Sequence, residues 1–372
     1  MREYDVIVVG SGVWGAATTW ALAKRGYRVL GLDQYLPPHN KGSHGGETRL
    51  ARLSNSSGEP IQLTIETLDL WRALGREVDQ QILLETGTMF VGQAGSRWFD
   101  STLENLAESP FDYELETPAK AMERIAGVKI MPNESVIWEP AGNVILVESA
   151  IKGLHLAARR LGAEFEFNRA VTDWTASPRG VKVATVESKY RAQKLVIAVG
   201  AFSETFLGLN LPLIVERQVV FNFPMIRDSH VLPSFYFAAP PGSEAAPSYG
   251  CSEPDGTYKV SIAGTGNCIS PDEMTQNVTH AELERVQDVV MERLPILDKE
   301  PTKSMVCMWS EVSDGSWLLD KHPSYNNVIV GAGCNGRGFR YGAVIGEMLA
   351  DLVEEKGSSV LNMFGMKRFD DY

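Results

Sequence analysis

The first apolar run of the chain, Tyr4–Val9, leads through a glycine-rich turn into an alanine-rich stretch. The β-branched residues of the run predict a buried strand, and the composition of residues 16–25 predicts a helix. A second apolar run over 29–32 then ends at an acid, Asp33. This order of patterns predicts a strand-helix-strand unit over about residues 3–34.

The turn has the sequence Gly10-Ser11-Gly12-Val13-Trp14-Gly15, which is a Gly-x-Gly-x-x-Gly motif. Gly10 permits the tight turn, Gly12 lets the backbone approach a pyrophosphate, and Gly15 lets the helix pack closely on the strand. The N–H groups at the start of the helix favour phosphate oxygens, and Asp33 is placed to bind a ribose hydroxyl. The flanking strands and the acid favour a dinucleotide site over a glycine-rich turn without a ligand.

The rest of the chain divides into apolar patterns of two kinds. Helical periodicity predicts helices over 62–77, 149–161, 281–294 and 342–355. Strand patterns cover 82–91 (with Gly87 as a turn or bulge), 163–167, 181–187, 194–199, 219–224, 234–238, 258–262 and 327–333. The strands at 194–199 and 327–333 are apolar after their first residue and lead into or end in glycine, which is typical of buried strands in a nucleotide-binding sheet.

Both ends of the chain therefore contribute to one nucleotide lobe, and the middle forms a second lobe. We expect an α/β fold with two lobes, a Rossmann-like FAD-binding domain interleaved with a mostly antiparallel substrate domain. The predicted FAD-binding domain comprises 1–80, 145–215 and 300–372, and the substrate domain 81–144 and 216–299. The interleaving favours an FAD oxidoreductase over an NAD dehydrogenase, in which the nucleotide domain is more often contiguous.

Composition narrows the classes of partner. The 372 residues carry a formal net charge of −12, which argues against nucleic acid or an anionic membrane as a partner but leaves room for a local basic pocket. No apolar run reaches 18 residues, and the apolar start is interpreted as a core strand rather than a signal peptide. Four scattered cysteines, Cys251, Cys268, Cys307 and Cys334, and six histidines without metal-ligand spacing predict reduced thiols, a cytoplasmic location and no metal.

At this point four segments carry a family resemblance. The glycine motif, residues 42–52, the sequence Trp138-Glu139-Pro140-Ala141-Gly142 and residues 307–346 resemble the monomeric sarcosine oxidase family of flavin amine oxidases, from end to end of the chain. The resemblance implies FAD, bound covalently through a thioether from Cys307 to the 8α-methyl group. The alternative for Cys307 is a buried free thiol. The implied FAD-binding residues are Gly10, Gly12, Val13, Trp14, Gly15, Asp33, Gln34, Ser43, His44, Thr48, Arg49, Val171, Ala198, Gly200, Cys307, Gly336, Gly338, Phe339 and Arg340.

The same resemblance assigns catalytic and substrate roles. Lys259 matches the family lysine over the flavin that assists the reaction with oxygen, where a fixed cation stabilises a developing anion. Arg49 matches an arginine close to the flavin ring. Arg52 and Arg340 match the cations that bind the substrate carboxylate, Arg340 in place of a lysine. The alternatives are an exposed strand lysine for Lys259 and a surface charge for Arg340.

Departures from the family pattern bear on the substrate. Tyr249 and Trp309 are assigned to the pocket, where Trp309 replaces a tyrosine, and Gly45 and Ala263 stand near the positions of two family histidines. A pocket without these imidazoles has more volume, which favours an N-substituent larger than methyl. The segment 253–260 resembles fructosyl amino acid oxidases (amadoriases), although a plain turn would have the same sequence signature.

We therefore expect an oxidase of secondary amines that takes N-substituted amino acids and O2 and releases hydrogen peroxide. Fructosyl amino acids, which would give glucosone and the free amino acid, are the first expectation. Sarcosine, other N-methyl amino acids, pipecolate and proline are the alternatives. An NAD(P)-dependent dehydrogenase and a flavin-binding protein without turnover are the competing classes. The expected oligomeric state is a monomer or weak dimer.

Overall fold

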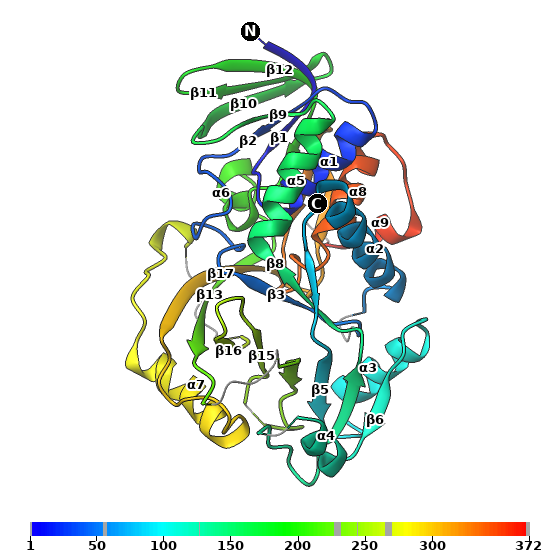
Figure 1. The fold of residues 1–372 in the computed structure, drawn as a ribbon. Helices are drawn as coiled ribbons and strands as arrows, with labels where there is room; N and C mark the ends of the chain where they lie inside the picture. The colour runs from blue at the N-terminus through cyan, green and yellow to red at the C-terminus, as the bar shows by residue number, and fades with distance from the viewer. Residues whose placement is uncertain are drawn as a thin grey trace.

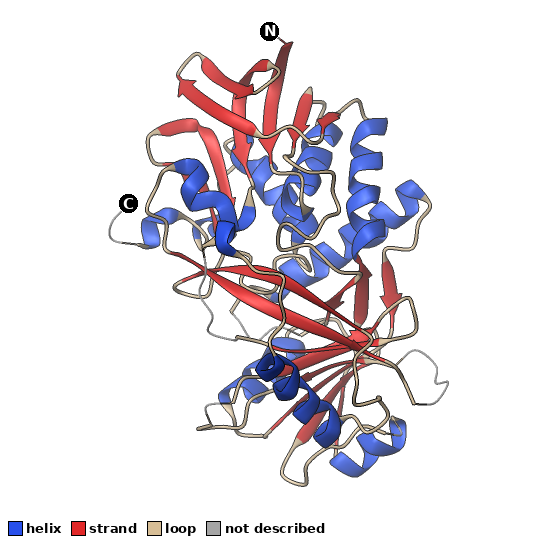
Figure 2. Cartoon of the chain, turned by 90° about the vertical axis from the view of Figure 1, so that its left-hand side faces the viewer, coloured by secondary structure: helices blue, strands red, loops and turns tan. Residues whose placement is uncertain are grey.

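The computed structural model describes residues 2–54, 58–125, 127–226, 232–243, 245–264 and 270–369. The chain forms two lobes, with the N-terminus at the far end of one of them (Figure 1). Each lobe is built around one large sheet, and long strands run along the boundary between the lobes (Figure 2). Positions in the rest of the chain, including Cys268, lie outside the described residues.

The first sheet has a parallel centre, because its strands return to the same edge through helices and long crossovers. Its parallel strands, in spatial order, are β19 (Tyr325–Ala332), β12 (Lys189–Ile197), β1 (Arg2–Val9), β2 (Val29–Leu32) and β9 (Glu164–Glu166). Antiparallel strands extend it at β10 (Val171–Ser177), β11 (Gly180–Thr185) and β18 (Leu318–His322). β1, β12 and β19 supply the apolar, buried centre.

Helices cover this sheet and pack on one another through small residues. They are α1 (Val13–Lys24), α2 (Ile61–Val78), α5 (Val147–Arg160) and α8 (Gly342–Val353). A Cβ added at Gly346 of α8 would lie 2.5 Å from Ala17 of α1, so glycine is needed where these two helices cross. A Cβ at Gly15 would lie 1.8 Å from the carbonyl oxygen of Gly10, whose φ is +89°. The close helix-strand contact predicted for Gly15 is therefore present.

The second sheet is antiparallel except where β14 pairs with β5. In spatial order it contains β17 (Lys303–Val312), β13 (Leu213–Phe223), β16 (Tyr258–Ile262), β15 (Ser248–Ser252), β14 (Ser234–Phe237), β5 (Thr88–Gly92), β7 (Ser135–Glu139) and β6 (Glu114–Glu116). The helices of this lobe are α3 (Arg97–Ala107), α4 (Pro118–Arg124) and α7 (His280–Arg293). α7 begins at a capping box in which the side chains and backbones of Thr279 and Glu282 bond reciprocally.

A small third sheet lies where the lobes meet. It consists of β3 (Thr48–Ala51), β8 (Asn143–Leu146) and β4 (Leu83–Glu85). Short helices at α6 (Ser203–Leu207) and α9 (Ser359–Asn362) complete the regular structure, with 3₁₀ turns at Gly200–Phe202, Pro271–Glu273 and Met366–Arg368. Among the described residues no helix is both long and apolar enough to cross a membrane.

The α/β architecture with one parallel and one mostly antiparallel sheet is the predicted fold class. The predicted strand 82–91 is two strands, β4 and β5, broken at Gly87 with φ +72°. α3, β10, β15 and β17 were not predicted from periodicity. β17 lies within the segment 300–372 assigned from sequence to the FAD domain, yet it pairs along its whole length with β13 in the second sheet.

Candidate active site

A cavity of about 670 Å³ lies between the two large sheets. Nearly all the residues assigned to the site from sequence line it, whichever lobe they come from. They are Gly10, Gly12, Val13, Trp14, Asp33, Gln34, Ser43, His44, Arg49, Arg52, Val171, Ala198, Gly200, Tyr249, Lys259, Cys307, Trp309, Gly336, Gly338, Phe339 and Arg340. Gly15 and Thr48 do not line it: Gly15 lies under the turn, and Thr48 lies behind Lys259.

One end of the cavity is formed by the β1–α1 turn. Asp33, at the end of β2, is 8% exposed and accepts hydrogen bonds from the backbone N–H groups of Ser11 (2.7 Å) and Tyr35 (2.9 Å). Burial raises the pKa of this carboxyl, but the imidazole of His39, 3.7 Å away, and the bonds from the two N–H groups outweigh burial, so the pKa lies below its usual value. Asp33 is thus an anion held in place with one side toward the cavity.

Two buried histidines flank this end. His44 accepts a hydrogen bond from the backbone N–H of His39 at Nε2 (3.3 Å), and His155 of α5 lies 3.0 Å from the hydroxyl of Ser11. Burial lowers the pKa of His44 to about 3, helped by His39, and the pKa of His155 to about 4, helped by Arg159. Both imidazoles are therefore neutral near pH 7. His155 had no signal in the sequence, because it stands in an ordinary amphipathic helix.

The middle of the cavity carries Arg49 at the start of β3. Its guanidinium donates to the backbone carbonyls of Thr48 (2.8 Å), Ser43 (3.0 Å) and Gly45 (2.5 Å) and lies 5.4 Å above the ring of Phe339. Within the described part of the chain it has no carboxylate partner. The loop carbonyls therefore fix its position while its positive charge stays uncompensated.

Arg52 and Arg340 form a pair of cations on the same wall. The guanidinium of Arg52 lies 4.5 Å above the ring of Tyr236 and 5.5 Å from that of Phe90, and its buried Nη1 has no hydrogen-bond partner among the described residues. Arg340, 4% exposed, donates from Nη1 to the carbonyl of Arg52 (3.0 Å) and to that of Ser54 (3.0 Å). Burial and the charge of Arg340 lower the pKa of Arg52.

The nearest acid does not neutralise this pair. The carboxylate of Glu139, in β7, accepts from the backbone N–H groups of Leu53 (2.6 Å) and Ser54 (3.2 Å). Burial raises its pKa despite these bonds. In the part of the chain that the structure describes, neither Arg52 nor Arg340 makes an ion pair. Two buried guanidinium groups without an acid form a ready receptor for an anion.

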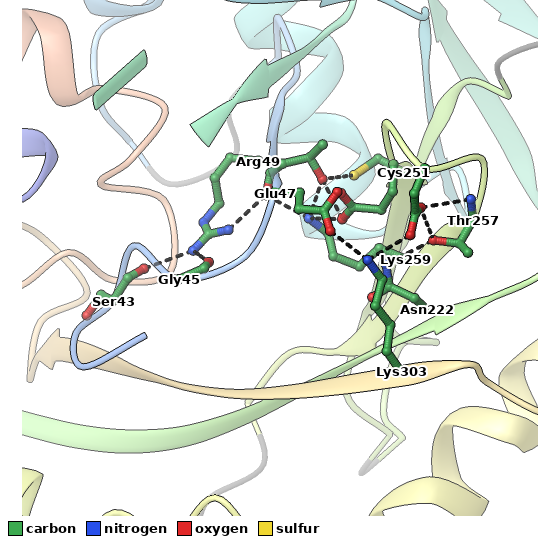
Figure 3. A network of polar contacts seen from close by, with 12 residues as sticks. Ser43, Gly45, Glu47, Arg49, Asn222, Cys251, Thr257, Lys259 and Lys303 are labelled. Carbon is green, nitrogen blue, oxygen red and sulfur yellow. Dashed lines mark hydrogen bonds and ion pairs between the residues drawn. The ribbon is translucent and has the colours of Figure 1, made fainter. Parts of the chain in front are cut away.

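Lys259 of β16 lies on the same cavity and is 5% exposed. Its ammonium group contacts the carbonyl oxygen (2.7 Å) and hydroxyl (2.6 Å) of Thr48 and one carboxylate oxygen of Glu253 (3.2 Å). Figure 3 shows this network beside Arg49. The interpretation of Lys259 as an exposed strand lysine is therefore wrong.

Cys307 lies across the cavity on β17. Burial raises the pKa of its thiol, and the charges of Arg49 and Lys259 partly offset this effect, so the three groups lie within electrostatic reach of one another. The Tyr249 and Trp309 rings stack 6.4 Å apart at 28°. The turn at Gly336 fits closely against Trp309, since a Cβ there would lie 3.0 Å from its ring. A flat cofactor could lie between the thiol, the cations and these rings.

The described residues also fit the dinucleotide of FAD. Gly12 caps α1 without a side-chain bond, and the first turn of α1 contains no acid, so its N–H groups are available to phosphate oxygens. A Cβ at Gly10 would lie 2.3 Å from the carbonyl oxygen of Ala198, so the approach of β1 to β12 requires glycine. The turn, the helix and Asp33 together form the cradle that a pyrophosphate and a ribose need.

Comparison with known proteins agrees with this geometry. The family model for FAD dependent oxidoreductases matches residues 5–352. Monomeric sarcosine oxidase of Bacillus sp. (strain B-0618) is 30% identical over 380 residues, which cover 98% of this chain and 96% of that protein. N-methyl-L-tryptophan oxidase of Citrobacter koseri is 26% identical over 99% of both chains. The solved structure of NikD, an amino acid oxidase essential for nikkomycin biosynthesis, has the same fold (TM-score 0.83, 24% identity, 96% of each chain).

Fold, cavity and family model together define a class: the chain belongs to the FAD-dependent oxidoreductases. Within that class it belongs to the monomeric sarcosine oxidase family, and it is an FAD-dependent amine oxidase. The competing interpretation as an NAD(P)-dependent dehydrogenase is thereby wrong.

The names of the relatives favour the alternative of N-methyl amino acids over the first expectation of fructosyl amino acids. The curated relatives just described are named for sarcosine and N-methyl-L-tryptophan. Amadoriase I of Aspergillus fumigatus shares the fold (TM-score 0.79, 19% identity, 98% of this chain and 89% of that one). At this identity the likeness shows the fold alone.

Tyr236 and Glu253 are the side chains of the site that sequence reasoning missed. Tyr236 lies within the strand predicted over 234–238, but nothing in its spacing shows that it faces Arg52. Glu253 was noted only as part of the segment 253–260, with its resemblance to fructosyl amino acid oxidases or a plain turn as the two interpretations. Its pairing with Lys259 depends on how the β15–β16 hairpin and β3 meet.

Proposed function

We propose that this enzyme oxidises N-methyl and other N-alkyl α-amino acids at the secondary amine, using O2 and releasing hydrogen peroxide. The observation that carries the proposal is the pair of buried guanidinium groups, Arg52 and Arg340, that face the cavity without an acid among the described residues. The names of the relatives, which refer to sarcosine and N-methyl-L-tryptophan, support the N-methyl class.

In this proposal the two arginines bind the substrate carboxylate. Arg52 presents Nη1 from an aromatic base of Tyr236 and Phe90, and Arg340 bonds back to the carbonyl of Arg52. Fixing the carboxylate fixes the α-carbon and the amine attached to it, which lowers the entropic cost of reaching a reactive geometry. FAD, when bound, would supply the redox chemistry: it would take a hydride from the carbon bonded to the amine nitrogen, leaving an imine, and pass two electrons to O2, which takes up two protons to give hydrogen peroxide.

In this proposal Arg49 and Lys259 stabilise negative charge that develops during the reaction. Arg49, held by loop carbonyls, stabilises negative charge that develops on the cofactor side of the cavity. Lys259, from the opposite lobe, stabilises the anion that forms when oxygen is reduced. Neither residue needs to exchange a proton with the substrate for these roles.

The pocket favours an amino acid larger than sarcosine. Ala263 and Trp309 line the cavity, and Gly45 lies beside it with its carbonyl on Arg49. Small residues at two of these positions leave room, and the stacked rings of Tyr249 and Trp309 offer an apolar face. We infer that the substrate carries an apolar side chain or N-substituent that packs on this face.

A peroxide-release screen tests the proposal. Purified enzyme is given sarcosine, N-methyltryptophan, N-methylleucine, pipecolate, proline, fructosyl-valine and ε-fructosyl-lysine. We expect the N-methyl derivatives of apolar amino acids to have the highest kcat/KM. Highest activity with a fructosyl compound would overturn the substrate class, and bleaching of the flavin by none of these amines under anaerobic conditions would favour a flavin-binding protein without turnover.

We also propose that Cys307 attaches FAD through a thioether. The buried thiol lies on the cavity within the field of Arg49 and Lys259, which favours its thiolate over that of an isolated buried cysteine. Acid-precipitated enzyme should stay yellow, and the Cys307→Ala variant should release its flavin on precipitation. Cys251→Ala, which removes the other described fully buried thiol, serves as control and should retain the colour. Colourless precipitate from the parent enzyme would exclude covalent attachment.

A further inference from the structure

Lys259 differs from the other cations of the active site in having its charge matched. An ammonium group has three protons to donate. The three oxygen contacts of Lys259 are the carbonyl of Thr48, the hydroxyl of Thr48 and Oε1 of Glu253, at 2.7, 2.6 and 3.2 Å. The first two contacts are hydrogen bonds and the third is an ion pair, and Arg49 donates to the same carbonyl of Thr48, so the network joins the two cations through β3 (Figure 3).

The hydrogen bonds around Thr48 fix the direction of the network. Its hydroxyl has one proton and accepts one bond from Lys259, so it donates that proton to Oε1 of Glu253, 2.7 Å away. The thiol of Cys251, 3.3 Å from the same hydroxyl, must then be the donor in that contact. Burial raises the pKa of this thiol, which agrees with its protonated form.

Glu253 is a buried acid whose carboxylate contacts Lys259 and the hydroxyl of Thr48. It is 7% exposed, and its second carboxylate oxygen, Oε2, is buried without a hydrogen-bond partner among the described residues. A buried carboxylate with one unsatisfied oxygen is costly to fold. The turn that carries it already closes through backbone bonds between Glu253 and Thr257, so the turn itself does not require an acid at this position.

A second set of ion pairs, centred on the exposed Lys303, involves the same turn. Lys303 bridges Glu47 (2.6 Å) and Asp255 (2.7 Å), and its side chain is 41% exposed. Asp255 shares the turn with Glu253 but contacts Lys303 in place of Lys259. The hairpin thus places two acids two residues apart, one against the active-site lysine and the other against a surface lysine.

We propose that Glu253 is a positioning residue that restrains Lys259 and attenuates its charge, so that the reaction with oxygen is slower than an unpaired lysine would allow. This inference rests on the proposed role of Lys259 in oxygen reduction. The carboxylate of Glu253 lies 3.2 Å from the ammonium group of Lys259. In a medium of low dielectric constant the electric field of the carboxylate largely cancels that of the ammonium group, so the anion formed from oxygen is attracted less strongly to Lys259. Arg49, Arg52 and Arg340 keep their full charge by comparison.

The experiment compares Glu253→Gln with Asp255→Asn and Lys259→Met, all as flavin-loaded enzymes at pH 6.5. Glutamine keeps the shape and a bond to Thr48 but removes the negative charge. We expect reoxidation of the reduced flavin by O2 to be about 3- to 10-fold faster in Glu253→Gln, with anaerobic reduction by substrate unchanged. The midpoint potential of the flavin should rise in the same variant, because one negative charge near it is lost. Asp255→Asn should leave all three quantities as in the parent.

A double-mutant cycle on the unfolding of the flavin-loaded protein measures the pairing without catalysis. Glu253→Gln should lower the free energy of unfolding, and most of that loss should vanish when Lys259 is already methionine. Slower reoxidation, or an unshifted potential, in a folded Glu253→Gln enzyme would overturn attenuation. If Lys259→Met leaves reoxidation unchanged, the proposed role of Lys259 fails as well, which separates the two failures.

Discussion

At the scale of single residues, this site is defined by which charges have partners. Lys259 has Glu253, whereas Arg49 and the pair Arg52–Arg340 bond to backbone carbonyls or stack on aromatic rings. Carbonyls and rings fix a guanidinium in space but leave its charge available. Arg52 and Arg340, which are proposed to bind the substrate carboxylate, are therefore cations that form no ion pair among the described residues.

Replacing Arg52 by alanine tests that proposal. We expect KM for N-methyl amino acids to rise about 10- to 100-fold, because a charge-assisted pair worth about 1.5–3 kcal/mol is lost. The fold should tolerate the change, since among the described residues the guanidinium of Arg52 stacks on Tyr236 and Phe90 and its Nη1 has no hydrogen-bond partner. Steady-state kinetics with the amino acid and with its methyl ester measure the effect.

The matched control is Arg72→Ala on α2, a half-buried arginine paired with Asp69. It should leave KM unchanged. An Arg52→Ala enzyme whose KM equals that of the parent, or whose KM rises equally for the ester, would remove Arg52 from carboxylate binding. Arg340→Ala is a less clean variant, because its guanidinium also holds the carbonyls of Arg52 and Ser54.

At the scale of secondary-structure elements, the β1–α1 turn shows how closely local backbone geometry and cofactor binding are joined. Gly15 of α1 packs on the carbonyl of Gly10 at a distance that admits no side chain, and Gly346 of α8 does the same against Ala17. These two contacts place the start of α1 over the end of β1. The N–H groups of the helix then point toward the cavity rather than along the sheet.

Gly15→Ala should disturb this turn. A Cβ at this position would lie 1.8 Å from the carbonyl oxygen of Gly10, so the helix must shift. We expect a loss of about 1–3 kcal/mol in the free energy of unfolding, the usual cost of overpacking, together with a lower FAD content after purification. Gly357→Ala, where an added Cβ meets nothing within 4 Å, is the control and should change neither quantity. Normal FAD content in Gly15→Ala would show that the turn tolerates a wider helix-strand gap.

At the scale of the whole molecule, two neutral histidines couple folding to pH. His44 and His155 have pKa values lowered to about 3 and about 4 by burial, below the usual 6.5. Between about pH 4 and pH 6.5 both imidazoles bind protons in the unfolded chain but stay neutral in the folded protein. Stability is therefore greatest above pH 6.5 and falls as the pH is lowered from 6.5.

Chemical unfolding at several pH values between 6.5 and 5 measures this coupling above the range in which most carboxylates titrate. The free energy of unfolding should fall by up to about 1.4 kcal/mol per pH unit for each histidine that stays neutral. His155→Gln should reduce the slope, whereas His280→Gln, an exposed histidine on α7, should leave it unchanged. A parent protein whose stability does not change over this range would contradict the buried, neutral state of both imidazoles.

Local patterns were enough for most of the framework. Helix α2 was predicted over 62–77 and observed at Ile61–Val78, and β12 and β19 were recognised as buried strands, because periodicity and glycine signals are properties of a few adjacent residues. Some of the strands were harder to recognise. β4 and β5 were merged, and β17 was not predicted as a strand, since its partner β13 lies about ninety residues earlier and only pairing stabilises such a segment.

The sequence by itself determined the fold class, the cradle for a dinucleotide and, through family resemblance, most of the cavity lining, because glycine geometry and apolar periodicity are written locally. Only the tertiary structure decided which charges are matched. Arg340 bonds to the carbonyl of Arg52, 288 residues away, and Lys259 meets Thr48, 211 residues away. Whether a buried cation has an acid beside it depends on how two lobes close over one cavity, and no pattern along the chain encodes that distance.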